Sequence, residues 1–290
     1  MGKRAGLIAW VAVGVLAAGG AFLYARDQAR GGGEAVEPPA RGLPHTPDYH
    51  ALFVFPDDSE HLLLGTHVGV YESTDGGVRW RFLGLEGSDA MHFARGESGA
   101  IWVAGHHVLE RSEDGGKTWH QVEPEGLRGL DIHGFATSLG GDLLYAAVAG
   151  EGLYRSDDGG ASFREISDEV GPNVYALAVT NDGMLVAADR GRGIVVNANG
   201  DGVEWVETLP METAGLASNG LDPPERAVLA AGESVQLLDG ARESEVVLMA
   251  ENGAGPVAFA PSDPDIAYVI TFDRKLHRSD DGGETWREVA

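Results

Sequence analysis

The sequence predicts an all-β protein: a single six-bladed β-propeller of four-stranded blades, preceded by one N-terminal transmembrane helix. Three observations lead to this prediction. A Ser-x-Asp-Gly-Gly motif recurs along the chain, a short apolar segment begins about every 40 residues, and an uncharged apolar stretch follows the first basic residues. One blade cannot bury both of its faces, so repeats of this kind must stack on their neighbours and close into a ring.

The motif occurs four times in nearly identical form, and each copy ends in an aromatic residue. The copies begin at Ser73, Ser112, Ser156 and Ser279, so the steps between them are 39, 44 and 123 residues. The last step is three times 41, so two altered copies are expected inside it. Asn197 lies 41 residues after Ser156, and Leu238 lies 41 residues further on. The spacing therefore predicts six units.

A second periodic feature agrees with this count. Apolar first strands are expected to begin at His50, Asp89, Ile132, Val174, Thr213 and Gly255. A second strand follows each of them, a third leads into the motif and a fourth leaves it. Four short strands in each period of about 40 residues are typical of a propeller blade. A pair of β-sandwiches is the alternative, and it would not produce so regular a repeat.

The motif is expected to stabilise a hairpin between the third and fourth strands of a blade, not to catalyse. The Asp and Ser side chains can bond to turn amides, the glycines tolerate unusual backbone angles, and the aromatic ring packs between blades. An EF-hand calcium loop is excluded because it needs a glutamate at its twelfth position. The expected structural residues are Ser73, Asp75, Gly77, Trp80, Ser112, Asp114, Gly116, Trp119, Ser156, Asp158, Gly160, Phe163, Ser279, Asp281, Gly283 and Trp286.

The N-terminal segment divides into two expected parts before the propeller of residues 45–290. Residues 1–26 hold Lys3 and Arg4 and then an apolar stretch from Ala5 to Ala25. As a helix this stretch would be about 30 Å long, close to the hydrocarbon thickness of a membrane. An uncleaved anchor is favoured over a cleaved signal peptide, because the apolar part is long for a signal sequence. Residues 27–44 contain glycine, proline and charge, and are expected to form a flexible linker.

Charge and composition exclude several classes of function. The formal net charge of −24 would repel phosphate backbones, so nucleic acid is not an expected partner. The chain contains no cysteine, which excludes disulfides, thiolate metal sites, a cysteine nucleophile and a lipid anchor on cysteine.

Candidate ligand-binding residues lie where first strands begin and second strands end. In antiparallel neighbours these two positions open on the same face, near the axis, opposite the motif hairpins. Imidazoles and carboxylates that converge there could bind a divalent metal or a polar ligand. The simpler alternative is a set of polar side chains around a solvated channel mouth. The candidates are His50, His67, His106, His133, Asp89, Glu151, Asp189 and Asp273.

The four intact motifs are similar to the Asp box, also called the BNR repeat. Residues 50–73, 88–119 and 130–160 resemble a bacterial group of Asp-box proteins labelled F510-type glycosyl hydrolases. The blades are more distantly similar to sortilin domains and to photosystem II assembly-factor propellers. This resemblance implies a single propeller behind an N-terminal membrane segment.

The expected function is a binding or assembly scaffold, tethered to the membrane by the N-terminal helix, with a monomeric propeller on the extracytoplasmic side. Its ligand would be a protein or a glycan. The alternative is a glycoside hydrolase of the sialidase-like superfamily that uses the axial mouth. Sialidases resembling this fold need three arginines that grip a carboxylate. Arg190 and Arg274 occur at suitable positions here, and a third arginine is not evident.

Overall fold

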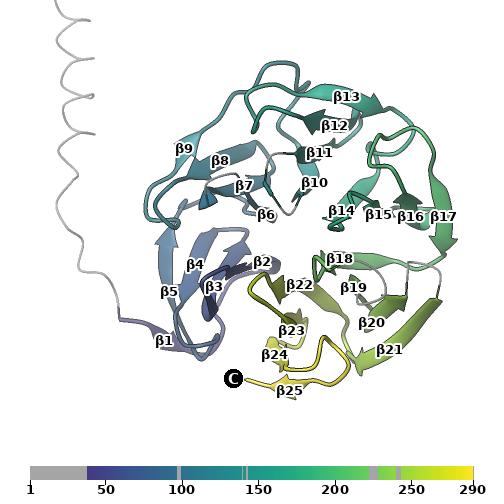
Figure 1. Cartoon of the computed structure of the whole chain (residues 1–290). Coiled ribbons are helices and arrows are strands. Elements are labelled where there is room, and N and C mark those ends of the chain that lie inside the picture. The colour runs from purple at the N-terminus through teal and green to yellow at the C-terminus, as the bar shows by residue number, and fades with distance from the viewer. Residues whose placement is uncertain are drawn as a thin grey trace, which may run out of the picture. The chain divides into compact units, whose positions relative to one another are not determined.

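The computed structural model describes residues 38–96, 99–138, 140–141, 143–221, 228–239 and 243–289. It confirms the predicted all-β fold with six four-stranded blades around a central axis (Figure 1). The expected N-terminal helix lies outside the described residues. Within the described part of the chain, no helix has the length and apolar character needed to cross a membrane.

Within each blade the strands are antiparallel and follow one another from the axis to the rim. The innermost strands are β2 (Tyr49–Phe55), β6 (His92–Arg95), β10 (Ile132–Thr137), β14 (Val174–Val179), β18 (Thr213–Ser218) and β22 (Ala254–Ala260). The second strands are β3 (Asp58–Thr66), β7 (Ile101–Gly105), β11 (Leu144–Val148), β15 (Leu185–Asp189), β19 (Val228–Gly232) and β23 (Asp263–Thr271). The third strands are β4 (Gly69–Ser73), β8 (Val108–Ser112), β12 (Gly152–Ser156), β16 (Gly193–Asn197), β20 (Ser234–Asp239) and β24 (Lys275–Ser279). The outermost strands are β5 (Arg79–Gly84), β9 (His120–Gln121), β13 (Arg164–Ser167), β17 (Val206–Leu209), β21 (Glu243–Met249) and β25 (Arg287–Glu288).

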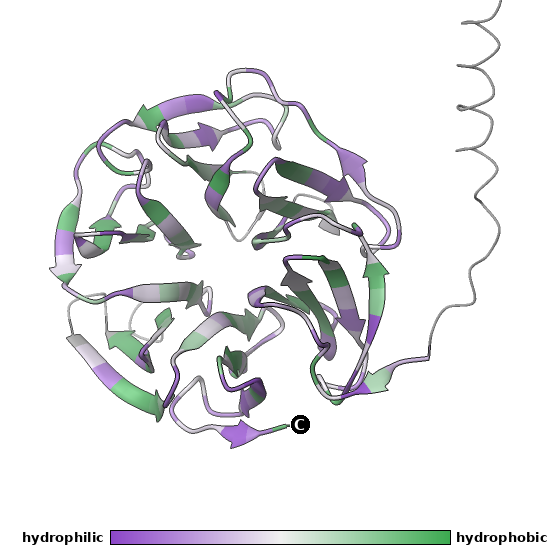
Figure 2. Ribbon diagram, turned by 180° about the vertical axis from the view of Figure 1, so that it is seen from behind, coloured by the Kyte–Doolittle hydropathy of each residue, from purple (hydrophilic) through white to green (hydrophobic). Residues whose placement is uncertain are grey.

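Hydrophobic clusters join each pair of neighbouring blades. The second strands are buried on both faces. In β3, for example, the consecutive residues Leu62, Leu63 and Leu64 have no exposed surface. One face of such a strand packs against the preceding blade and the other against the following blade, so that Leu62 and Leu63 belong to different clusters. Apolar residues are accordingly concentrated in the inner and middle strands, while the rim is mixed (Figure 2). Burial between blades therefore provides the main stabilisation of the ring.

The ring closes between blade 1 and blade 6 by side-chain packing. Leu52 and Trp80 of blade 1 share a buried cluster with Tyr268 and Ile270 of blade 6. The Tyr268 hydroxyl donates a hydrogen bond of 2.9 Å to the carbonyl oxygen of Ser59. All strands of blade 6 come from residues after 253, so the described strands show no exchange between the ends of the chain.

A short strand joins blade 1 ahead of the expected start of the propeller. Strand β1 (Ala40–Arg41) pairs with the outer edge of β5, with Ala40 opposite Trp80. It lies within the stretch expected to be linker, whose part up to residue 37 is outside the described residues. An edge strand that is covered in this way no longer offers unpaired backbone groups to other chains.

The four intact motifs form closely similar hairpins, which we call the motif hairpins. In the hairpin after β8, the Ser112 hydroxyl donates to Asp114 Oδ1 at 2.9 Å and accepts from the amide of Gly116 at 2.8 Å. The amide of Thr118 donates to Asp114 Oδ1 at 2.8 Å, and its hydroxyl donates to Asp114 Oδ2 at 2.7 Å. The two motif glycines, Gly115 and Gly116, have φ angles of 76° and 87°, which L side chains rarely adopt.

The altered copy in blade 4 reaches a similar turn with different atoms. Asn197 Oδ1 accepts the amide of Asp201 at 2.9 Å, in place of the serine hydroxyl. The Asn197 amide donates to Asp201 Oδ1 at 3.1 Å, and Trp205 Nε1 donates to the carbonyl of Gly202 at 3.0 Å. The aromatic anchor is thus kept although the serine is replaced.

Candidate functional site: the axial mouth

The innermost strands begin, and the turns after the second strands lie, at the same end of the central channel. We call this end, over blades 1 to 6, the axial mouth. The strand register places the start of the innermost strand opposite the end of the second strand. In blade 1 Tyr49 pairs with Thr66, and in blade 4 Val174 pairs with Asp189. Side chains from consecutive blades therefore face one another around the same opening.

Four side chains of blades 1 and 2 meet at the mouth, and we call them the first cluster: Asp48, His50, His67 and Asp89. The Nε2 atom of His50 lies 3.3 Å from Nδ1 of His67. It lies 3.2 Å from Oδ1 of Asp48 and 3.1 Å from Oδ1 of Asp89. The Nδ1 atom of His67 is 3.4 Å from the same Asp89 oxygen and 3.8 Å from Oδ2 of Asp48.

Three side chains of blades 2 and 3 form a second cluster: His106, Asp131 and His133. Oδ1 of Asp131 lies 2.5 Å from Nδ1 of His106 and 3.1 Å from Nε2 of His133. Burial raises the pKa of Asp131, but the hydrogen bond with His106 and the charges of both imidazoles outweigh it, so the pKa is below its ordinary value. The Asp131 carboxylate is thus already occupied by hydrogen bonds within this cluster.

Asp89 connects the two clusters. Its Oδ1 faces the first cluster, while Oδ2 lies 3.8 Å from Nε2 of His106 in the second. Its side chain is only 10% exposed. Although two imidazole nitrogens lie near Oδ1, none of the described groups donates a hydrogen bond of acceptable geometry to it. A buried carboxylate oxygen without a donor is costly, so this atom is expected to have a ligand.

The backbone around Asp89 is clamped between two blades. The next amide, of Ala90, donates to the carbonyl of Thr66 in blade 1 at 3.0 Å. The amide of Met91 donates to the carbonyl of Ala104 in blade 2, also at 3.0 Å. Gly105 permits the close approach, because a Cβ atom there would lie 1.9 Å from the carbonyl oxygen of Asp89. The Asp89 side chain is therefore held at a defined place in the mouth.

The remaining candidates from the sequence lie apart from these clusters. Glu151 is exposed in the turn after β11. Asp189 is buried at the end of β15, where desolvation raises its pKa. Oδ1 of Asp273 accepts a hydrogen bond of 2.5 Å from the Thr271 hydroxyl, and Oδ2 lies 3.3 Å from Nζ of Lys275. The candidates His50, His67, Asp89, His106 and His133 are the ones that the structure brings together.

Sequence reasoning missed Asp48 and Asp131. Each lies two residues before a mouth histidine, in the segments Asp48-Tyr49-His50 and Asp131-Ile132-His133. Residues two apart in a strand point to the same face, so this repeated Asp-x-His pattern could have identified both carboxylates.

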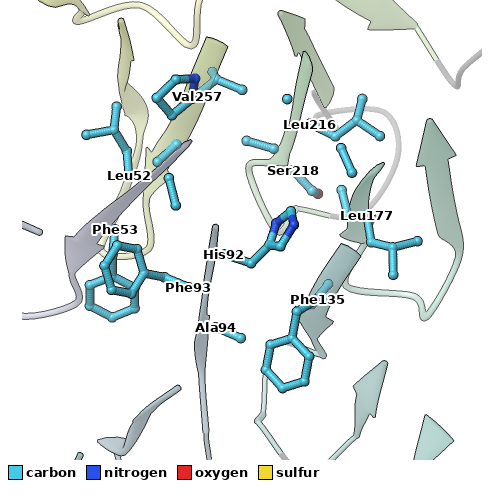
Figure 3. Close-up of a pocket in the computed structure, with 18 of the residues that line it drawn as sticks. Leu52, Phe53, His92, Phe93, Ala94, Phe135, Leu177, Leu216, Ser218 and Val257 are labelled. Carbon is cyan, nitrogen blue, oxygen red and sulfur yellow. The ribbon is translucent and has the colours of Figure 1, made fainter. Parts of the chain in front are cut away.

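Behind the mouth lies a narrow central cavity of about 230 Å³. Its wall is formed by the innermost strands, and most of the residues that line it are apolar, Leu52, Phe135, Leu177 and Val257 among them. In Figure 3 the His92 ring points into the middle of this space, toward Ser218. Removal from water lowers the pKa of His92 to about 4, so the imidazole is neutral near pH 7.

Comparison with known proteins gives two kinds of relative. The family model described as "Photosynthesis system II assembly factor YCF48" matches residues 46–290. The photosystem II assembly lipoprotein Ycf48 of Synechococcus sp. (strain CC9902) is 24% identical over 244 residues, which are 80% of this chain and 72% of that protein. A solved structure of YCF48 bound to D1 peptide has a TM-score of 0.55 at 21% identity, covering 88% of this chain and 85% of the other.

Glycoside hydrolases are the second kind. The GH74 xyloglucanase of Xanthomonas campestris has a TM-score of 0.58 at 18% identity, and 87% of this chain covers 47% of that enzyme. A xyloglucanase of Paenibacillus sp. is 28% identical over 172 residues, which are 51% of this chain and 16% of the enzyme. This chain thus spans about half of the solved enzyme and a smaller part of the other, and the structural likeness shows the fold alone. The match to the family model covers most of the chain, and the protein therefore belongs to the photosynthesis system II assembly factor YCF48 family.

Proposed function

We propose that this protein is a membrane-tethered assembly factor whose propeller binds a segment of a partner protein at the axial mouth. The observation that supports this most directly is the contrast in hydrogen bonding between the two faces. The aspartates of the motif hairpins are occupied by their own turns, whereas Asp89 Oδ1 at the mouth has no hydrogen-bond donor among the described residues. Unsatisfied polar groups at the open end of a channel are suited to bind a ligand.

The shape of the channel favours a polypeptide over a glycan. Pockets for small molecules usually measure about 300–1,000 Å³, and the cavity of about 230 Å³ is smaller. Its described lining includes His50, His92 and Arg95 and no carboxylate, whereas most glycosidases need two carboxylates beside the scissile bond. A polypeptide lying across the mouth could insert one side chain into this space. The relative YCF48 has been solved bound to D1 peptide.

The proposed tether is the apolar stretch of residues 5–25. The Synechococcus relative is named a lipoprotein, which associates that protein with a membrane. This sequence holds no cysteine that could carry a lipid, so a spanning helix would take the place of the lipid anchor. The propeller would then lie on the extracytoplasmic side: Lys3 and Arg4 favour a cytoplasmic N-terminus, although Arg26 and Arg30 at the other end of the stretch weaken this bias.

Site-specific photocrosslinking in cells that produce this protein tests the partner proposal. A photoreactive amino acid at Glu151 or Glu233 would report on the mouth, and the same residue at Lys117 or Glu284 would report on the motif-hairpin face. All four side chains are exposed. We expect a discrete adduct with a membrane protein from the mouth positions only. Equal adducts from both faces, or adducts from the hairpin face alone, would contradict the proposal.

Glycoside hydrolysis is the alternative that the xyloglucanase likeness and the F510-type resemblance favour. Full-length protein should be incubated with xyloglucan and with fluorogenic glycosides, including sialosides. The scaffold proposal expects no turnover above the level of a heat-denatured control. Turnover that is lost in Asp89→Asn and Asp131→Asn, while folding is kept, would replace it with an enzymatic function.

A further inference from the structure

Ligand atoms of Asp48, His50 and His67 all lie within 4.8 Å of one another, and Oδ1 of Asp89 lies beside both histidines. Each imidazole nitrogen of His50 and His67 lies 3.1–3.8 Å from an oxygen of Asp48 and an oxygen of Asp89, and the two nitrogens are 3.3 Å apart. Zinc bonds to nitrogen and oxygen at about 2.0–2.2 Å with tetrahedral geometry. Ligand atoms around such an ion are therefore about 3.3–3.6 Å from one another.

The cluster does not form a satisfied hydrogen-bond network. Oδ1 of Asp89 and Oδ1 of Asp48 are both buried atoms without a hydrogen-bond partner among the described residues. Both nevertheless lie within 3.2 Å of His50 Nε2, so the atoms are close but poorly aligned for donation. The hydrogen bond that is present joins His50 Nε2 to His67 Nδ1, so the two carboxylate oxygens are the atoms left for an ion to satisfy.

From this geometry we propose that Asp48, His50, His67 and Asp89 bind one divalent transition-metal ion, with Zn²⁺ the best fit. Two imidazoles and two carboxylates match the ligand types of zinc, whereas calcium and magnesium prefer oxygen ligands alone. The charge balances, because two carboxylates neutralise a divalent cation. The ion would link β2, the turn after β3 and the segment before β6, and so join blades 1 and 2 at the mouth.

The second cluster supports this site from outside. Metal-bound carboxylates and imidazoles are usually oriented by further polar partners. Oδ2 of Asp89 points away from the first cluster toward His106, whose other ring nitrogen is bonded to Asp131. His106 thus lies within ion-pair distance of Asp89, on the side away from the proposed ion. The ion would satisfy Asp89 Oδ1, the same atom that supports the partner proposal; zinc binding is measured on the protein alone, so its outcome is separate from that of the crosslinking.

Zinc binding to the full-length chain, purified in detergent without a polyhistidine tag and stripped with a chelator, tests the proposal. Isothermal titration with Zn²⁺ and elemental analysis after dialysis should both give one ion per chain. Asp89→Asn and His50→Gln should each weaken zinc binding by at least ~10–100-fold, the loss typical even of supporting residues. Substitution with Co²⁺ should give the strong visible absorption of four-coordinate cobalt in the wild type and not in these variants.

Two matched variants serve as controls. His107→Gln removes the exposed histidine next to His106, and Asp273→Asn removes an aspartate at the corresponding turn of blade 6. Both should keep one zinc ion with unchanged affinity. If Asp89→Asn does not fold, as judged by circular dichroism, His67→Asn replaces it, because the His67 side chain is 54% exposed. Wild-type protein that takes up no zinc, or a ligand variant that binds as tightly as wild type, would overturn the proposal.

Discussion

The motif hairpins and the axial mouth both place aspartates at the ends of strands, but the two regions use them differently. In the hairpin after β12, Asp158 accepts from the Ser156 hydroxyl and from both the amide and the hydroxyl of Ser162. At the mouth, Asp89 Oδ1 has close imidazoles but no well-aligned donor among the described groups. The hairpin aspartates are therefore part of the fold, whereas Asp89 remains available to a ligand.

The difference shows why repetition alone does not identify a functional residue. The motif aspartates recur because every intact hairpin needs the same turn. The mouth residues differ from blade to blade: the first position after the second strand is His67 in blade 1 and His106 in blade 2, but Arg190 in blade 4. Residues that differ between the blades therefore indicate a ligand site better than residues that recur from blade to blade.

The largest expected effect on stability comes from adding a side chain at Gly105, where the backbone of Asp89 leaves no room for one. Gly105→Ala would place a Cβ atom 1.9 Å from a backbone oxygen, which cannot rotate away. We expect a loss of about 3 kcal/mol, the upper end of the usual cost of overpacking. Urea denaturation measures it. Gly129→Ala is the control, because its Cβ would meet only Val148 at 3.6 Å. Equal effects of the two substitutions would show that the Asp89 segment is not clamped.

A smaller loss is expected from a single serine of the motif hairpins. Ser112→Ala removes the acceptor of the Gly116 amide and a donor to Asp114. Leaving a buried amide unpaired should cost about 1–2 kcal/mol. Ser88→Ala, in the loop before blade 2, should change the free energy of unfolding by less than ~0.5 kcal/mol. A negligible loss at Ser112 would mean that the hairpin does not depend on its hydroxyl.

The lowered pKa values of the hairpin aspartates also predict that the fold loses stability in acid. Hydrogen bonds from Thr118 and Ser162, respectively, lower the pKa values of Asp114 and Asp158 from 3.8 to about 2. Because the folded pKa lies below the unfolded one, this stabilisation is complete above pH 4 and is lost as the pH falls toward 2. Urea midpoints measured between pH 5 and pH 2 should fall less in the double variant Asp114→Asn and Asp158→Asn. Parallel curves for variant and wild type would refute the assignment.

Comparison of sequence with structure separates two levels of prediction. The six blades followed from the spacing of the motif copies, because each copy closes one hairpin. The shared location of His50, His67, Asp89, His106 and His133 followed from strand direction. Their distances could not be predicted, because these depend on how neighbouring blades rotate against each other. Asp189 lies at the end of a second strand, one of the two positions that meet at the mouth, but its side chain is buried. Its burial could not be read from the sequence.

The smallest expected effect concerns the aromatic anchors of the hairpins. Trp286 Nε1 donates to the carbonyl of Gly283 at 3.0 Å, whereas Trp119 Nε1 is a buried donor without a partner among the described residues. Trp286→Phe should therefore cost about 0.5–1.5 kcal/mol more than Trp119→Phe, the net value of one hydrogen bond. Thermal melts of the two variants make the comparison. A greater loss at Trp119 would show that the indole nitrogen is not what distinguishes the two sites.

The contrast between the two regions can be tested most directly by anomalous diffraction at the zinc edge from crystals grown with Zn²⁺. We predict a peak at the axial mouth, within bonding distance of Asp89 Oδ1, His50 Nε2 and His67 Nδ1, and none at Asp114 or Asp158. Zinc on the aspartates of the motif hairpins with an empty first cluster would contradict the account.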